Sequence, residues 1–245
     1  MKHLEAIGRY FIMLYEIFRK QTKWSISKKL ILKEIDDLMY SSLGIIAFIS
    51  LFVGAVIAIQ MALNISNPLI PKSLIGFATR QTFILEFAPT FTSIIVAGKV
   101  GSFITSSIGT MRVTEQIDAL DIMGVNSLNY LIFPKIIALM LYPFAICMSM
   151  ALGMYGGYMA ATIGQYATSA EFLEGLKLQF KPFDITYALI KSFIFAFVLA
   201  TIPAYHGYYM KGGALDVGKA STISFVWTSV AIIVIDFIIT QILLT

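Results

Sequence analysis

The feature that most constrains this chain is the length of its stretches without a charged residue. No Asp, Glu, Lys or Arg occurs between Asp37 and Lys72, or between Lys135 and Glu171. A helix needs about 20 consecutive apolar residues to cross the hydrocarbon core of a bilayer. Across the chain, 58% of residues are hydrophobic and 13% are charged, with a mean hydropathy of +0.82, whereas a soluble domain carries about 25% charged residues. The sequence therefore predicts a polytopic integral membrane protein of the all-α class.

Five apolar segments are candidates to cross the membrane. They cover about 39–63, 84–107, 136–170, 188–210 and 221–244. The third is long enough for one long helix or for two short crossings, and we favour one because two would leave almost no residues for a turn. Lys and Arg collect on the cytoplasmic side of membrane proteins. Their distribution does not decide between five and six crossings, but both versions put the N-terminus and residues 109–124 in the cytoplasm.

Residues 1–37 precede the transmembrane domain, which we place at 38–245. This segment contains eight of the 18 basic residues. Its apolar residues repeat at the spacing of one helix face: Leu4, Ile7, Phe11, Leu14 and Phe18. The pattern predicts an amphipathic helix that lies in the membrane interface, with a soluble helix packed on a partner as the alternative.

The segment Gly109–Gly124, GTMRVTEQIDALDIMG, interrupts this apolar chain with charge. Four charged residues occur within ten positions: Arg112, Glu115, Asp118 and Asp121. A helix over about 112–124 has Val113, Ile117 and Leu120 on one side, and Gly124 suits the left-handed residue that follows a helix. Because three acids are costly in hydrocarbon, the helix should lie outside it. From the residues alone, it is either a rigid handle through which another protein pulls on two spans or an ordinary connecting loop.

The stretch AGKVGSFITSSIGTMRVTEQIDALDIMGVNSLNYLIFPKIIA, residues 97–138, resembles the signature of the MlaE family of permeases. The likeness extends to LEFAP (85–89), IKSFIFAF (190–197), GGALDVGKAS (212–221) and IDFIIT (235–240). The family consists of inner-membrane subunits of ABC transporters that move phospholipid between the two membranes of Gram-negative bacteria. The resemblance implies a homodimer that works with two ABC ATPase subunits and an MCE-type periplasmic lipid-binding protein. ATP and Mg²⁺ would bind to the ATPase, and this chain would have no cofactor of its own.

The resemblance also implies that the charged segment is the coupling helix, the part of the permease on which the ATPase docks. The residues expected to contact the ATPase are Arg112, Glu115, Gln116, Asp118, Leu120 and Asp121. Family members typically have AGRVGSA-AAELG where this chain has Lys99 and Ser106-Ser107. Lysine keeps the charge of arginine but lacks its planar fork of donors. Ser107 stands where relatives carry a glutamate near the expected lipid route.

Glu86, Lys99 and Asp236 lie within predicted spans, where a charged residue is a functional-site candidate. Glu86 and Lys99 are thirteen residues apart and should not pair on one straight helix. For Glu86 and Lys99, a role in transport and a structural polar contact between helices are both open hypotheses. For Asp236 we favour the structural contact. Gln60 and Leu63, near the outer end of the first span, are our candidates for substrate contacts.

Other motifs predict no further chemistry. Residues 213–219 match the G-x-x-x-x-G-K of a phosphate-binding loop, but Ala220 replaces the Ser or Thr that holds Mg²⁺ and no strand precedes the motif; we expect a tight turn. His3 and His206 are the only histidines and offer no metal-ligand set. Cys147 is the single cysteine, which excludes an internal disulfide. The spacing of Gly153 and Gly157 allows close helix packing.

The sequence thus predicts a phospholipid permease driven by a separate ATPase. Two alternatives differ in testable ways. A secondary transporter would couple transport to ions through Glu86, Lys99 or Asp236, and would need no partner. A non-transporting scaffold for the MCE-type protein would assemble without moving lipid.

Overall fold

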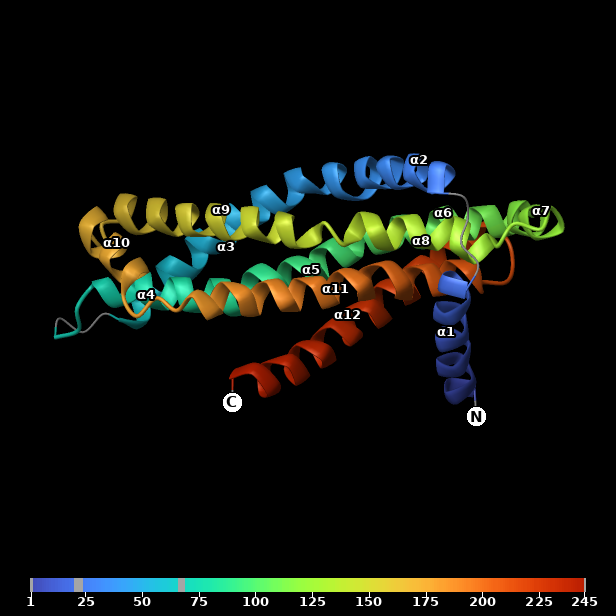
Figure 1. Ribbon diagram of the computed structural model, residues 1–245. Coiled ribbons are helices and arrows are strands. Elements are labelled where there is room, and N and C mark those ends of the chain that lie inside the picture. Colours follow the sequence, from blue (N-terminus) through green and yellow to red (C-terminus); the bar gives the residue numbers. More distant parts are fainter. Residues whose placement is uncertain (1, 20–23, 66–68, 245) are drawn as a thin grey trace. The chain divides into compact units, whose positions relative to one another are not determined.

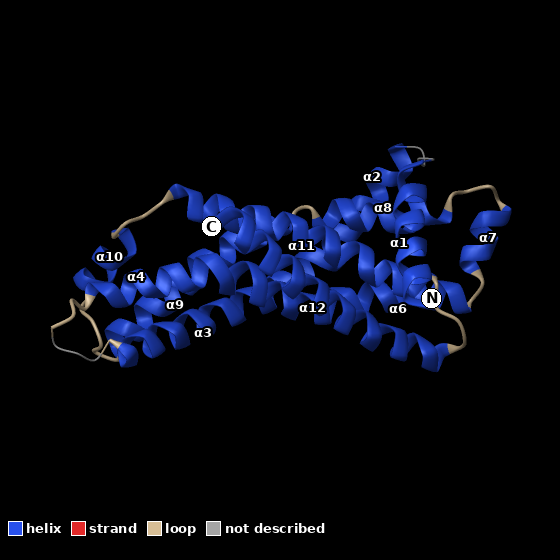
Figure 2. Ribbon diagram, turned by 90° about the horizontal axis from the view of Figure 1, so that it is seen from below, coloured by secondary structure: helices blue, strands red, loops and turns tan. Residues whose placement is uncertain are grey.

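The computed structural model of the protein describes residues 2–19, 24–65 and 69–244, and these contain helices but no strand (Figure 2). In chain order (Figure 1), the elements are α1 (Lys2–Arg19), α2 (Trp24–Glu34), η1 (Ile35–Tyr40), α3 (Ser41–Asn64), α4 (Ser73–Thr82), η2 (Phe83–Phe91), α5 (Thr92–Val96), η3 (Ala97–Gly101), α6 (Ser102–Val113), α7 (Gln116–Ile122), α8 (Ser127–Leu139), α9 (Tyr142–Ile163), α10 (Ser169–Lys177), α11 (Pro182–Tyr208) and α12 (Ala214–Leu244). The η elements are π-helical, with a wider turn than an α-helix.

Five helical stretches in the described residues are long and apolar enough to span a membrane: Trp24–Asn64, Ser73–Val113, Ser127–Ile163, Pro182–Tyr208 and Ala214–Leu244. The all-α polytopic fold is therefore confirmed. The long uncharged block belongs to a single stretch, α8 and α9, interrupted only at Met140 and Leu141. Pro143 accounts for the interruption, because proline has no N–H to donate to the carbonyl of Leu139 and its ring clashes with that carbonyl.

All five helical stretches begin earlier than the predicted spans, and they include charged residues that have partners. The third span begins at Ser127 rather than Ile136, and it includes Lys135, whose ammonium pairs with the Glu34 carboxylate. The second begins at Ser73 rather than Ile84 and includes Arg80. The buried Arg80 donates from Nη1 to the carbonyls of Leu176, at 2.6 Å, and Leu178, at 3.1 Å. The fourth begins at Pro182 rather than Ala188.

Within the N-terminal 37 residues, the structure describes two α-helical segments, Lys2–Arg19 and Trp24–Glu34. These are α1 and α2, and α2 continues through η1 into the first span, so the predicted boundary at residue 37 falls inside η1. Of the predicted apolar face, Ile7, Phe11 and Phe18 are exposed, which suits contact with lipid; the side chain of Leu4, like that of His3, lies outside the described part of the chain. The buried face of α1 is instead formed by Met13 and Ile17.

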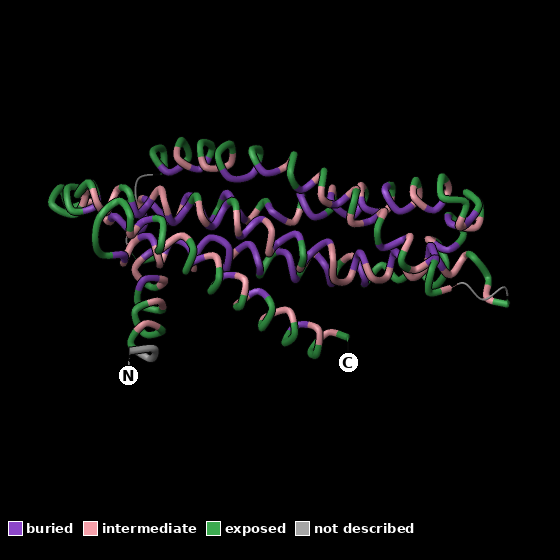
Figure 3. The backbone as a smooth tube through the Cα atoms, turned by 180° about the vertical axis from the view of Figure 1, so that it is seen from behind, coloured by how far each residue is buried: buried purple, intermediate pink, exposed green. Residues whose placement is uncertain are grey.

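The chain folds into two compact units. Unit 1 comprises Met1–Ser42, Ile94–Tyr142 and Ile194–Phe237, and unit 2 comprises Leu43–Ser93, Pro143–Phe193 and Ile238–Thr245. Figure 3 shows buried residues along the helices, while most residues of α2 and of the C-terminal part of α12 are exposed or half-buried. Many of the exposed side chains in α3 and α12 are large and apolar, as expected for helices that face lipid or another apolar surface.

Within unit 2, the backbones of α3 and α9 are in close contact. A Cβ added to Gly54 would lie 2.0 Å from the carbonyl oxygen of Gly153, and one added to Gly156 would lie 2.0 Å from that of Leu51. Small residues let helix backbones approach this closely in membranes, where van der Waals packing drives association. The close packing predicted from Gly153 and Gly157 is confirmed.

We expect Gly54→Ala to destabilise the protein, because the added methyl group meets rigid backbone rather than a movable side chain. Overpacking of this kind costs about 1–3 kcal/mol. Gly44→Ala is the matched control on the same helix, since a Cβ there meets nothing within 4 Å, and it should leave the midpoint of thermal unfolding unchanged or slightly raised. Equal midpoints for the two variants in detergent would contradict the backbone contact.

Candidate functional site

The charged segment of unit 1 is built from two helices with a sharp break between them. α6 runs to Val113, and α7 begins only at Gln116. Between them, Glu115 adopts left-handed backbone angles, with φ 58°, which costs a non-glycine residue about 1–2 kcal/mol. The prediction of one helix over 112–124 was therefore wrong in its first turn: Arg112 belongs to α6, and the separate helix is only Gln116–Ile122.

The end of α7 follows the expected pattern. Gly124 has φ 75°, its N–H donates to the Asp121 carbonyl, and the N–H of Val125 donates to the Leu120 carbonyl at 3.1 Å. These two bonds form the Schellman arrangement, which satisfies carbonyls at a helix C-terminus and favours glycine at the left-handed position. The predicted role of Gly124 is confirmed.

Arg112 ties α7 to the rest of unit 1. Its Nη1 lies 2.7 Å from Oδ1 of Asp118, and its guanidinium carbon lies 5.9 Å from the ring centre of Tyr208 on α11. A half-exposed ion pair of this kind contributes little stability by itself, but it holds α7 at one orientation across the break at Glu115. Two of the residues predicted to contact a partner, Arg112 and Asp118, thus contact each other.

The most exposed apolar residues of the segment lie at its tip. Ile122 is 87% exposed and Met123 is 67% exposed, whereas Ile117 is completely buried. The remaining residues of the predicted set divide by exposure: Glu115, Gln116, Asp118 and Asp121 are exposed, and Leu120 is half-buried. Sequence analysis missed Ile122 and Met123 because it considered only the apolar residues expected to face the protein interior. Two adjacent large apolar residues just before a predicted helix cap could have indicated an exposed apolar site.

The chain after the segment is anchored to α1. Asn126 caps α8 by accepting from the Asn129 N–H, and its Nδ2 donates to the Glu16 carbonyl at 3.0 Å. Nδ2 of Asn129 donates to the Ile17 carbonyl at 2.7 Å. Nearer the start of α1, the Tyr10 hydroxyl lies 2.7 Å from Oγ1 of Thr201 on α11, and burial raises the pKa of that hydroxyl despite the hydrogen bond. The chain that follows the charged segment is therefore bonded to the C-terminal part of α1.

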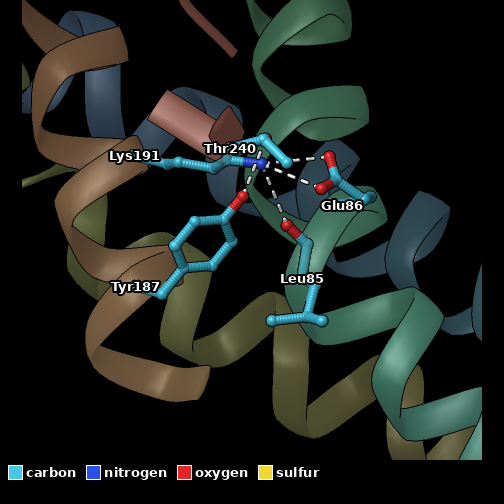
Figure 4. Close-up of polar contacts among 5 residues, drawn as sticks. All are labelled: Leu85, Glu86, Tyr187, Lys191 and Thr240. Carbon is cyan, nitrogen blue, oxygen red and sulfur yellow. Dashed lines mark hydrogen bonds and ion pairs between the residues drawn. The ribbon is translucent and has the colours of Figure 1, made fainter. Parts of the chain in front are cut away.

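A second candidate site lies in unit 2, around a lysine buried within a spanning helix (Figure 4). Lys191 on α11 is completely buried, and its Nζ lies 3.0 Å from both carboxylate oxygens of Glu86 on η2. The same ammonium lies 3.4 Å from the Leu85 carbonyl and 4.5 Å from the ring centre of Tyr187. The Tyr187 hydroxyl reaches Oγ1 of Thr240 on α12 at 2.8 Å. The cluster thus joins η2, α11 and α12.

Pro89 explains part of this geometry. In a regular α-helix the residue at position 89 would donate its N–H to the Leu85 carbonyl, but proline has none. The Lys191 ammonium donates to that carbonyl instead, and the helix widens into the π-helical turn of η2. π-Helical turns are rare in proteins, but those that occur are often found at functional sites. Sequence analysis did not single out Lys191, although a lysine inside an apolar span was a readable signal.

The other predicted intramembrane residues, Lys99, Ser107 and Asp236, lie on η3, α6 and α12, respectively. The Lys99 ammonium donates to the Ser41 carbonyl within unit 1, so Glu86 and Lys99 have different partners, as expected from their spacing. Ser107 and Asp236 are half-buried on α6 and α12. Gln60 and Leu63 are exposed on α3; their proposed contact with substrate stays a prediction.

The segment that resembles a phosphate-binding loop begins in the turn before α12 and continues into the start of that helix. Gly212 has φ 114°, Oδ2 of Asp216 accepts from the Gly213 N–H at 3.1 Å, and Oδ1 of Asp216 pairs with Lys219 at 3.0 Å. The predicted turn is confirmed, and its lysine is engaged by a carboxylate. Within the described residues, no three His, Cys, Asp or Glu side chains gather as metal ligands would.

Comparison with known proteins gives one consistent result. Residues 31–242 match the family model of the permease MlaE. A probable ABC transporter permease protein from Rickettsia bellii is 32% identical over 97% of this chain and 92% of its own length. The chloroplastic protein TRIGALACTOSYLDIACYLGLYCEROL 1 of Arabidopsis thaliana is 31% identical over 86% of this chain and 60% of its own length. A probable ABC transporter permease protein from Synechocystis is 29% identical over 93% of this chain and 86% of its own length.

Proposed function

Because the chain belongs to the MlaE family of ABC transporter permeases, we propose that it moves phospholipid between the inner and outer membranes of a bacterium, driven by a separate ATPase. The permease is a multi-pass membrane protein and is not itself an enzyme. In this proposal it lies in the inner membrane as a homodimer, with the N-terminus in the cytoplasm and an MCE-type lipid-binding protein on the periplasmic side.

The observation that carries the proposal is the construction of the charged segment. α7 presents two exposed apolar residues, Ile122 and Met123, beyond an ion pair that fixes its orientation. An exposed apolar tip rimmed by charges is the pattern of a protein-binding site, since anchors of this kind fill pockets on a partner. A partner that grips α7 also pulls on α6 and α8, and on α1 through Asn126.

A two-tailed lipid as substrate is supported by the apolar surfaces of α3 and α12 and by the relatives. The name of the Arabidopsis relative is that of a diacylglycerol glycolipid. An apolar route suits such a molecule, because burying its chains in a charged cavity would leave polar groups unsatisfied.

The direct test is to purify the chain with a co-expressed ABC ATPase, reconstitute both in liposomes, and measure ATP hydrolysis and transfer of labelled phospholipid to an MCE-type acceptor. We expect lipid to stimulate hydrolysis and transfer to require ATP. Transfer driven by an ion gradient without ATP would support the secondary transporter instead. A stable assembly that moves no lipid would support the scaffold.

A further inference from the structure

Unit 1 contains a cavity of about 550 Å³ where two π-helical turns, η1 and η3, face each other. Its lining is mixed in chemistry: Asp36, Asp37, Leu38, Tyr40, Ser41, Lys99, Val100 and Phe103. We propose that this cavity binds the headgroup of a zwitterionic phospholipid with a primary ammonium group, held between Lys99 and the carboxylates of Asp36 and Asp37.

The backbone of η1 shapes one wall of the cavity. The N–H of Ser41 donates to the Asp36 carbonyl, five residues earlier, as in a π-helix, and the Ser41 hydroxyl donates to the Asp37 carbonyl at 2.6 Å. The main-chain groups are thereby engaged within the turn. The side chains of Asp36 and Asp37 are exposed, and no ion pair to either carboxylate is found in the described residues.

Lys99 provides the opposite charge from η3. Its ammonium has three donors, and one of them bonds to the Ser41 carbonyl. Two N–H groups remain for a ligand on the cavity side. The site therefore offers one cation and two anions, which matches a phosphate joined to an ammonium group better than it matches a lone anion or a lone cation.

The position of the cavity favours a lipid over a soluble molecule. Asp37 is the last charged residue before the uncharged run of the first span, so η1 lies where the polar headgroup region meets hydrocarbon. Leu38, Val100 and Phe103 give the same cavity apolar walls, against which the first methylene groups of a lipid can pack. A primary ammonium can donate hydrogen bonds to Asp36 and Asp37, whereas a choline headgroup has no N–H to donate.

The inference concerns binding and needs neither ATP nor a partner, so its test is separate from that of the proposed function. The full chain, purified in detergent, would be titrated with phosphatidylethanolamine, phosphatidylglycerol and phosphatidylcholine of identical acyl chains, with binding counted by native mass spectrometry. We expect phosphatidylethanolamine to bind about tenfold more tightly than either other lipid, the effect of losing one charge-assisted hydrogen bond.

Variants separate this site from any other lipid on the protein. D36N/D37N should remove the preference for phosphatidylethanolamine and strengthen phosphatidylglycerol binding, because repulsion of the anionic headgroup is relieved. K99Q should weaken both lipids. D216N removes an exposed carboxylate that does not line the cavity, and it should leave the binding of both lipids unchanged. All variants should unfold at the temperature of the unmodified protein. For D36N/D37N we expect this because both side chains are exposed.

The proposal would be overturned if D36N/D37N kept the full preference for phosphatidylethanolamine. It would also be overturned if soluble glycerophosphoethanolamine competed as well as the lipid at equal concentration, because the apolar walls would then contribute nothing. A reversed preference in D36N/D37N with the unfolding midpoint unchanged would support it, since a merely structural role for these carboxylates gives no reason for lipid selectivity to change.

Discussion

Ile122→Ser combined with Met123→Ser will abolish copurification of the ATPase and will uncouple ATP hydrolysis from lipid. Both side chains are exposed in the isolated chain, at 87% and 67%, so the change costs the fold little. Burial of one large apolar side chain contributes about 1.5–3 kcal/mol, and the loss of two corresponds to at least about a 100-fold weaker association. Copurification and lipid-stimulated hydrolysis by the reconstituted complex measure the effect.

Two control variants make this prediction specific to the tip of α7. Leu215→Ser removes an equally exposed side chain, at 85%, from the start of α12, and should leave the association intact. Glu115→Ala removes a charge at the rim, and should weaken association by less than tenfold and in a salt-dependent way. If the double serine variant still binds the ATPase while Glu115→Ala does not, docking depends on the acidic residues that the family resemblance indicates, and the apolar tip is not the anchor.

The charged segment illustrates how far the residues predict such a site. Its cap at Gly124 was predictable because a left-handed residue after a helix favours glycine for a simple steric reason. The break at Glu115 was not, because a left-handed glutamate has no sequence signature and persists only where the surrounding contacts enforce it. The pairing of Arg112 with Asp118 depends on that break, since residues six apart do not lie on one side of a continuous helix.

The intramembrane charges show what the sequence alone does not predict. Hydropathy located all five spans, but each helical stretch begins earlier than the predicted span, because a charge was taken as the end of an apolar segment. Lys135 and Arg80 lie inside helices because an ion pair and backbone carbonyls, respectively, satisfy them. These partners come from segments distant in the sequence, so no local pattern identifies them. The partner of Glu86 is likewise 105 residues away.

Glu86→Gln will destabilise the protein more than Lys191→Met, although both break the same ion pair. The reason is the difference in burial: the Lys191 side chain is 0% exposed and that of Glu86 is 42% exposed. Without Glu86, the buried ammonium loses its carboxylate partner, and removing one partner of a buried ion pair costs about 3–5 kcal/mol. Without Lys191, the carboxylate that remains is only partly buried, so less of its charge is desolvated. Unfolding in detergent micelles by denaturant titration gives the two free energies.

The paired variant Glu86→Gln with Lys191→Met distinguishes a structural ion pair from a transport element. Replacing both partners by uncharged groups of similar size removes the desolvation cost together with the attraction, so the double variant should regain most of the stability that Glu86→Gln loses. Lys219→Met, which breaks a pair that is 73% and 40% exposed, should cost less than about 1 kcal/mol. If the ion pair is only structural, the double variant should also keep ATP-driven lipid transfer. Recovered stability with abolished transfer would show that the charges themselves take part in transport, and would revive the ion-coupled alternative.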